Sequence, residues 1–259
     1  RRLTRPLASL ADAADGLARN LDQKPLEEKG PQEVRRAARS FNAMQRSLKA
    51  YLETRAQALA GVSHDLRLPL TRLRLRLEQL PEGESRSAMQ RDIEEMDAMV
   101  GGTLDYLRAG SDTEQAVKLN LNALVEGLAE DAEAAGAKVS LHGTALPVTA
   151  RPQALRRCLA NLIDNARRYG GGEVEVTIAD SAASVEIRIA DRGPGIPAGE
   201  RERVFEPYVR LEASRARHTG GTGLGLAIAR AVARAHGGEV TLAPGESGGT
   251  AAILTLPRR

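Results

Sequence analysis

The residues of this chain that could do chemistry fall into short groups. The first is Ser63-His64-Asp65-Leu66-Arg67-Leu68-Pro69-Leu70. A neutral imidazole near pH 7 is a nucleophile, and the carboxylate of Asp65 can serve as its base. The other groups come much later in the chain, at residues 161–169, 191–195 and 221–225, and they combine carboxamides, a carboxylate and glycines. Together these groups suggest a nucleotide site and a separate histidine that receives a phosphoryl group.

The segment 161–169 places polar side chains on one helix face. Asn161, Asn165 and Arg168 stand at i, i+4 and i+7. A carboxamide oxygen suits Mg²⁺, and a guanidinium suits phosphate oxygens. Taken alone, the motif is equally typical of a solvated helix face.

Two glycine-containing segments follow. Asp191 precedes Gly193 and Gly195, where its carboxylate can accept from an adenine amine and the glycines admit a close backbone approach. An Asx-type turn is the alternative interpretation of this segment. The run Gly221-Thr222-Gly223-Leu224-Gly225 leads directly into a helical pattern, so its exposed amides suit phosphate. It is not a P-loop, because no Gly-Lys-Ser/Thr follows.

The elements that must position these groups differ between the two halves of the chain. In the second half we expect helices over 121–135, 153–169 and 224–235. Alternating patterns predict strands at 174–178 and 185–189, and further strands are expected at 139–141, 239–242 and 251–256. Helices beside several adjacent strands predict a two-layer α/β sandwich.

The first half has a helical period. Apolar seams run through 3–17, 34–48, 59–80 and 89–107, with breaks at the connector 20–31 and the turn 81–83. In the register of the third seam His64 lies at the outermost position, and Pro69 predicts a bend nearby. A hairpin of two such helices buries too little alone, so we expect two copies to pair as a four-helix bundle in a homodimer.

Composition excludes several classes of protein. The 259 residues carry a net charge of +3 with only 2% aromatics, and the basic residues are interleaved with acidic ones, so we expect no nucleic-acid binding. The single Cys158 excludes an intrachain disulfide and indicates a buried thiol. There is no apolar run long enough to span a membrane. Arg1-Arg2 suits the cytoplasmic flank of a transmembrane segment absent from this chain, or an ordinary helix end.

These motifs, in this order, resemble the bacterial two-component sensor histidine kinases of the EnvZ-like group. Gly30-Pro31-Gln32-Glu33-Val34 and Phe41-Asn42-Ala43-Met44 resemble a HAMP domain. The later segments resemble the Bergerat (GHKL) ATP site that these kinases share with gyrase B. The resemblance further matches Val204-Phe205-Glu206-Pro207-Tyr208 and Gly248-Gly249-Thr250 to boxes of that site.

The resemblance implies three domains. They are a HAMP signal-relay domain at 1–54, a dimerisation and histidine phosphotransfer (DHp) domain at 55–112, and a catalytic ATP-binding (CA) domain at 113–259. The first two would be all-α and the third an α/β sandwich. The stretch 209–220 resembles a lid over ATP, although a surface loop explains it as well. The chain would be the cytoplasmic portion of an inner-membrane protein.

The resemblance also implies an activity. His64 would attack the γ-phosphoryl group of ATP with Asp65 as base, and the group would pass to an Asp on a response regulator receiver domain. Asn165 would hold Mg²⁺, Asp191 the adenine, and Gly223 and Gly225 the phosphates. The remaining nucleotide-binding residues would be Asn161, Arg168, Tyr169, Gly193, Gly195, Gly221, Thr222 and Leu224.

One position departs from the family pattern. Where these kinases carry Thr or Asn four residues after the histidine, this chain has Leu68, which predicts weakened phosphatase activity toward the regulator. Two other functions fit a related fold. One is an ATPase or Ser kinase without phosphohistidine, and the other is a signalling scaffold that only binds nucleotide.

Overall fold

The computed structural model describes residues 13, 24–109, 114–211, 221–246 and 248–258, and for a few residues of one long helix, including His64, it describes the backbone alone. The predicted helix over 3–17 lies outside these residues, apart from Ala13. Most of the predicted lid, 212–220, also lies outside them.

Two long helices make up the N-terminal part. Helix α2 spans Gln32–Glu78 and α3 spans Glu84–Ala109. The seams predicted over 34–48 and 59–80 therefore belong to one continuous helix, which passes through Pro69. The helix dipole interacts favourably with the negative charge of Glu33 in the first turn and the positive charge of Arg76 in the last turn. The turn at 81–83 is confirmed.

The connector before α2 is fixed by one buried carboxamide. Asn42, which is 7% exposed, accepts from the Leu26 N–H at 2.9 Å and donates to the Leu26 carbonyl at 3.0 Å. Ala38 and Phe41 are buried beside it. The Asn42 side chain thus satisfies both backbone polar groups of Leu26, as a neighbouring strand would.

The hairpin of α2 and α3 has a small interior. Leu70, Leu77 and Ile93 form its buried cluster, with Val100 packed against them. Other residues of the predicted seams remain exposed: Val62, Leu66, Leu73, Leu80, Met89 and Met96 are each 44–52% exposed. A single copy of the hairpin therefore leaves much of its apolar stripe uncovered.

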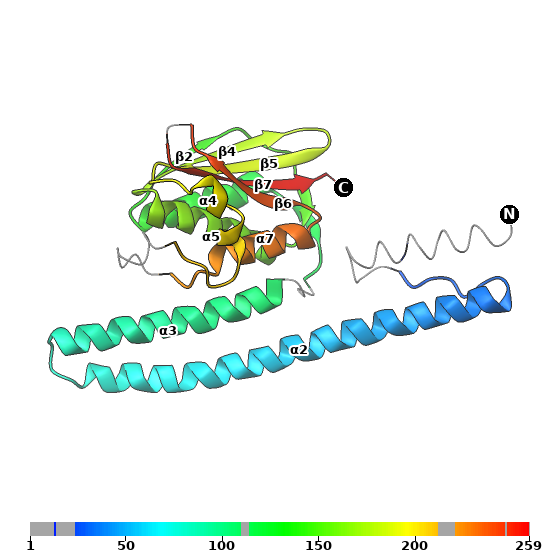
Figure 1. Cartoon of the computed structure of the whole chain (residues 1–259), viewed down its shortest axis with the longest axis horizontal. Helices are drawn as coiled ribbons and strands as arrows, with labels where there is room; N and C mark the ends of the chain where they lie inside the picture. Colours follow the sequence, from blue (N-terminus) through cyan, green and yellow to red (C-terminus); the bar gives the residue numbers. More distant parts are fainter. Residues whose placement is uncertain (1–12, 14–23, 110–113, 212–220, 247, 259) are drawn as a thin grey trace. The chain divides into compact units, whose positions relative to one another are not determined.

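The C-terminal part is a two-layer sandwich (Figure 1). Its sheet has the order β2-β4-β5-β7-β6, in which β2 and β4 are parallel and the other pairs antiparallel. The helices of this part cover one face of the sheet. The strands are β2 (Lys138–His142), β4 (Glu173–Asp180), β5 (Ser184–Asp191), β6 (Glu239–Pro244) and β7 (Thr250–Pro257), and the helices are α4 (Leu121–Ala134), α5 (Pro152–Tyr169) and α7 (Gly225–Ala235).

The expected fold class is confirmed, and each of the five predicted strands falls within an observed one. The sequence patterns missed a second, two-stranded sheet of β1 (Val117–Leu119) and β3 (Val148–Ala150). Strands of three residues are too short to show alternation. Cys158 is fully buried, and burial raises its pKa to about 12, which fits an inert structural thiol.

Candidate nucleotide site

One face of α5 lies against the glycine segment that leads into α7. The Asn161 side chain donates to the Arg157 carbonyl at 2.8 Å, and its Oδ1 would lie 3.2 Å from a Cβ added to Gly225. Farther along the helix, the Tyr169 hydroxyl would lie 3.3 Å from a Cβ on Gly221. The structure therefore brings together the segments 161–169 and 221–225, which lie more than fifty residues apart in the sequence.

Asp191 ends β5 inside a cradle of backbone. Its Oδ1 accepts from the Gly193 N–H at 2.8 Å and from the Thr250 N–H at 3.2 Å. A Cβ on Gly249 would lie 2.1 Å from the Asp191 carbonyl oxygen, and one on Gly170 would lie 2.3 Å from the Asp191 Cβ. Glycine is required at both positions because the neighbouring backbone occupies the space of a side chain.

The environment of Asp191 opposes its charge. Burial raises the pKa of this carboxyl above its ordinary value of 3.8, and the hydrogen bonds from Gly193 and Thr250 partly offset the shift. Both hydrogen bonds use Oδ1, and within the described residues none reaches Oδ2. A half-buried carboxylate oxygen with its partner oxygen held by two amides is suited to accept from an exocyclic amine of a base.

The segment 221–225 presents backbone rather than side chains. Gly221 and Gly223 have φ of 135° and 71°, which favour glycine. The Leu224 side chain is fully buried in the domain core, so its contribution to a ligand would come from its amide. The first amides of α7 at Gly225 have no intrahelical partner, and a helix start of this kind favours anions.

Arg168 and Asn165 lie on the same face of α5. The Arg168 Nε pairs with Asp164 Oδ2 at 2.7 Å, so a phosphate would share Arg168 with this carboxylate. Asn165 is half-buried. Within the described residues there is no group of three or more His, Cys, Asp or Glu side chains that could hold a metal. The carboxamide oxygen of Asn165 fits Mg²⁺, which commonly takes one or two protein ligands and completes its shell with phosphates and water.

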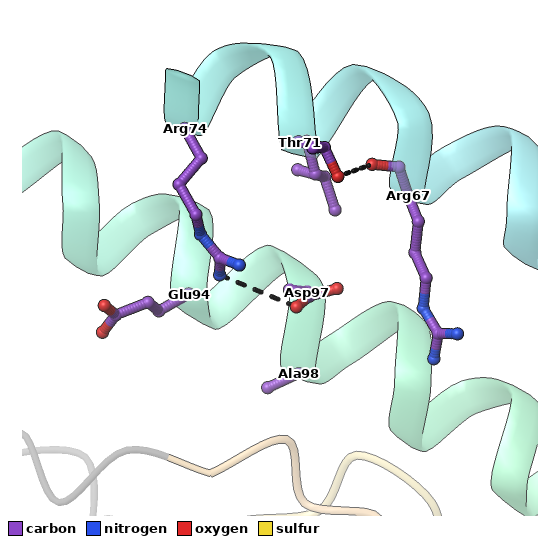
Figure 2. Close-up of a pocket in the computed structure, with 7 residues that line it drawn as sticks. Arg67, Thr71, Arg74, Glu94, Asp97 and Ala98 are labelled. Atoms are coloured by element: carbon purple, nitrogen blue, oxygen red, sulfur yellow. Dashed lines mark hydrogen bonds and ion pairs between the residues drawn. The ribbon is translucent and has the colours of Figure 1, made fainter. Parts of the chain in front are cut away.

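The histidine group lies on α2, a different helix from those that carry the candidate nucleotide site. Asp65, one residue after His64, is exposed. Figure 2 shows the groove one turn later, which Arg67 and Thr71 line from α2 and Asp97 lines from α3. The Thr71 hydroxyl donates to the Arg67 carbonyl at 3.0 Å, and Arg74 lies 3.7 Å from Asp97. The hydroxyl of Thr71 is therefore engaged by its own helix.

Comparison with known families accounts for both parts of the molecule. Residues 1–50 match the HAMP domain, and residues 54–112 match the His Kinase A phospho-acceptor domain. Residues 150–259 match the histidine kinase-, DNA gyrase B- and HSP90-like ATPase domain. This chain belongs to the bacterial sensor histidine kinases. The resemblance inferred from the motifs is thereby confirmed at the level of the family.

Individual sensor histidine kinases align over almost the whole chain. Sensor histidine kinase GtrS of Pseudomonas aeruginosa is 39% identical over 255 residues, which cover 98% of this chain and 53% of that protein. CpxA of Escherichia coli (strain K12) is 33% identical over 267 residues, covering 98% and 58%. The chain thus spans little more than half the length of these curated relatives.

A solved structure has the same architecture. Full-length ShkA in complex with AMPPNP is 29% identical, with a TM-score of 0.61, and the match covers 78% of this chain and 46% of that one. Within the described residues of this sensor histidine kinase chain, no helix has the length and apolarity to cross a bilayer.

Sequence reasoning missed part of the Asp191 cradle. Gly170 and the Thr250 amide were not assigned to the site, although Gly248-Gly249-Thr250 was recognised as a family element. The signal for Gly170 was present, because a glycine ends α5 directly after Tyr169. Its role depends on the position of Asp191, at the end of β5, beside that helix end.

Proposed function

We propose that this chain catalyses ATP-dependent autophosphorylation of His64 and passes the phosphoryl group to an Asp of a response regulator receiver domain. The observation that carries the proposal is that α5 links the two groups of residues. Asn161 and Tyr169 of α5 lie against the 221–225 backbone, and Gly170 at its end lies against Asp191, in a chain with a separate histidine-bearing helix. ATP would place its adenine at Asp191 and its phosphates at Gly223 and Gly225.

The phosphoryl transfer step needs no reactant other than this chain and ATP. A ring nitrogen of His64 attacks the γ-phosphorus, the new N–P bond forms, and the bond to the bridging oxygen breaks to release ADP. Asp65 accepts the imidazole proton. Mg²⁺ held through Asn165 would neutralise phosphate charge, and the rate gain comes mainly from positioning and charge compensation.

The partners follow from the same proposal. The exposed apolar stripe of the α2–α3 hairpin supports a homodimer through a four-helix bundle. We further propose that residues 1–54, 55–112 and 113–259 act as relay, phosphotransfer and catalytic domains. A transmembrane segment outside this chain would anchor it, and these residues would lie on the cytoplasmic side of a bacterial inner membrane. We propose no nucleic-acid partner.

Incubation with γ-labelled ATP and Mg²⁺ tests the proposal. We expect a label that is stable in alkali and lost in acid, absent from His64→Ala and retained in His142→Ala. His142 is an exposed histidine on β2, outside the site, and serves as the matched control. Acid-stable label would support the Ser kinase alternative. Nucleotide binding without any label would support the scaffold.

Leu68 carries a second proposal, that phosphatase activity toward the regulator is weak. Its side chain is 51% exposed and offers neither donor nor acceptor to orient a water. Thr71 does not replace it, because its hydroxyl is bonded to the Arg67 carbonyl. We expect Leu68→Thr to dephosphorylate purified phospho-regulator at least about tenfold faster, a change of about 1.4 kcal/mol in barrier. A parent chain that is already fast would contradict this role.

A further inference from the structure

Arg230 joins three separate segments of the catalytic domain. It lies in the middle of α7, and its side chain is 16% exposed. Its Nη1 donates to Glu202, and its Nε donates to Glu239 Oε1 at 2.8 Å. The guanidinium also lies over the Phe205 ring, 4.5 Å from the centroid. The guanidinium therefore makes contacts both through its N–H groups and through its planar face.

Glu202 precedes a short turn that ends at Phe205 and leads toward the nucleotide site. The turn is η2 (Arg203–Phe205), and the Phe205 side chain is 7% exposed. Three residues later, Tyr208 has a φ of 65°, which is unusual for a residue other than glycine. Such a conformation persists where the surrounding contacts over-determine it. Arg230 contacts this segment at Glu202 and at Phe205, six and three residues before Tyr208.

Tyr208 in turn supports the glycine segment. Its N–H donates to the Gly223 carbonyl at 2.9 Å. A Cβ on Gly223 would lie 2.9 Å from the Tyr208 carbonyl carbon and 3.1 Å from the Val209 carbonyl oxygen. The backbone of Tyr208 is thus the surface against which Gly223 packs. Because Gly223 leads directly into α7, where Arg230 lies, the contacts close into a ring.

We infer that Arg230 is a positioning residue for nucleotide binding, which holds the backbone of Gly223 in its ligand-binding geometry through Phe205, Glu202 and Tyr208. This inference rests on the proposed function. The role of Arg230 is support rather than phosphate contact, because its Nη1 and Nε donate to Glu202 and Glu239. Its effect would be to keep the segment 221–225 in one conformation before the nucleotide arrives.

The effect of losing this support is a change in apparent affinity. When only a fraction of molecules holds the competent backbone, the apparent Kd rises by the inverse of that fraction. Arg230→Met keeps an unbranched apolar side chain at this position and removes the charge and the N–H donors of the guanidinium. We expect it to raise the KM for ATP and the Kd for Mg-ADP by about five- to tenfold, with kcat within about twofold of the parent.

The two carboxylates that pair with Arg230, those of Glu202 and Glu239, provide a matched pair of variants. Glu202→Gln breaks the link to η2, and we expect a KM increase of about two- to threefold, since Glu202 is 79% exposed and its ion pair is screened. Glu239→Gln breaks the link to the start of β6, which does not lead to Tyr208. It should lower the melting temperature and leave the KM unchanged. Arg230→Lys should lie between the parent and Arg230→Met.

The measurements are autophosphorylation kinetics, calorimetric titration with Mg-ADP, and thermal unfolding, all on the full chain. The inference is overturned if Arg230→Met lowers only the melting temperature, or if Glu239→Gln raises the KM as much as Glu202→Gln does. A parent chain that binds Mg-ADP without phosphorylating His64 would contradict the kinase proposal alone. The Kd comparison would still decide the role of Arg230.

Discussion

The two parts of this molecule differ in how much of their apolar surface they bury by themselves. In the catalytic domain, helices α4, α5 and α7 and the five-stranded sheet share one continuous core. The α2–α3 hairpin has a cluster of Leu70, Leu77 and Ile93 and leaves residues such as Leu73 and Met96 half exposed. Each part has amphipathic helices, but a sheet covers those of the catalytic domain within the same chain.

This difference indicates a division of work. A domain that completes its own core can hold a rigid nucleotide site with backbone cradles such as that of Asp191. A hairpin that is completed by a second copy depends on assembly, and its stability is linked to protein concentration. Substitutions in one part should therefore leave the property of the other part unchanged, and the following predictions test this separation.

The largest effect is expected from Asn165→Ala. Removing the proposed metal ligand should slow autophosphorylation by about 100-fold or more, the scale on which one electrostatic group in an active site acts. Dimer formation should be unchanged because Asn165 lies in the catalytic domain. Labelling with γ-labelled ATP and analytical ultracentrifugation measure the two properties.

Arg156→Ala is the control for that substitution. Arg156 lies on the same helix and pairs with Asp131 at 2.7 Å, and both side chains are largely exposed. It should phosphorylate like the parent. Normal phosphorylation in Asn165→Ala would show that this face of α5 does not serve the metal.

Leu73→Asp should weaken the dimer and leave nucleotide binding unchanged, which is the reverse of the effect expected for Asn165→Ala. Two carboxylates placed in a bundle interior are costly, so we expect the dimer Kd to rise by about 100-fold, or about 2.7 kcal/mol. Binding of Mg-ADP should be retained. The matched control is Leu146→Asp, since Leu146 is 69% exposed on the catalytic domain and should not affect assembly. A Leu73→Asp chain that sediments as an unchanged dimer would contradict the bundle.

The same comparison explains which features could be predicted from the sequence. Strands β4 and β5 and helix α5 were predictable because each buries one face against a core in its own chain, which produces regular periods of two and 3.6. In the hairpin, the period predicted the helices correctly. The pattern itself does not state which chain covers the seam. The expectation of a second copy rests on the small area that one hairpin buries, and Leu66 and Leu73 are indeed half exposed in a single copy.

Sequence patterns indicate candidate site residues where the chemistry lies in side chains. They predict Asn161, Asn165 and Asp191 from residue type and spacing, and in the structure Asn161 lies against Gly225 and Asp191 lies against Gly249. The sequence does not indicate the contacts of Gly170 and of the Thr250 amide with Asp191, or that the Leu224 side chain is buried, because these features depend on backbone position. Such contacts arise from the register of β7 on β5 and from the end of α5, which no local pattern encodes.

A smaller effect is expected where the helical part does complete its own contacts. Asn42→Ala leaves the Leu26 N–H and carbonyl without their partner, which should destabilise the connector by about 1–3 kcal/mol. Amide hydrogen exchange at Leu26 and proteolysis by a lysine-specific protease after Lys29 should both accelerate. Arg39→Gln is the comparison, because its ion pair with Glu28 is exposed and worth less than about 1 kcal/mol. Equal effects from both substitutions would argue against the buried bond.

The smallest effect is a gain in stability from Asp191→Asn. Burial raises the folded-state pKa of Asp191 above its ordinary value, so its ionised form disfavours folding. The carboxyl contributes most to stability below pH 3.8, and this contribution is lost as pH rises through the folded pKa. An amide oxygen can still accept from Gly193 and Thr250 without this penalty. We therefore expect a slightly higher melting temperature at pH 7, a difference that vanishes toward pH 3, and loss of nucleotide affinity. A lower melting temperature at pH 7 would mean that the carboxylate stabilises the cradle. Asp191 would then contribute to the stability of the catalytic domain as well as to ligand binding.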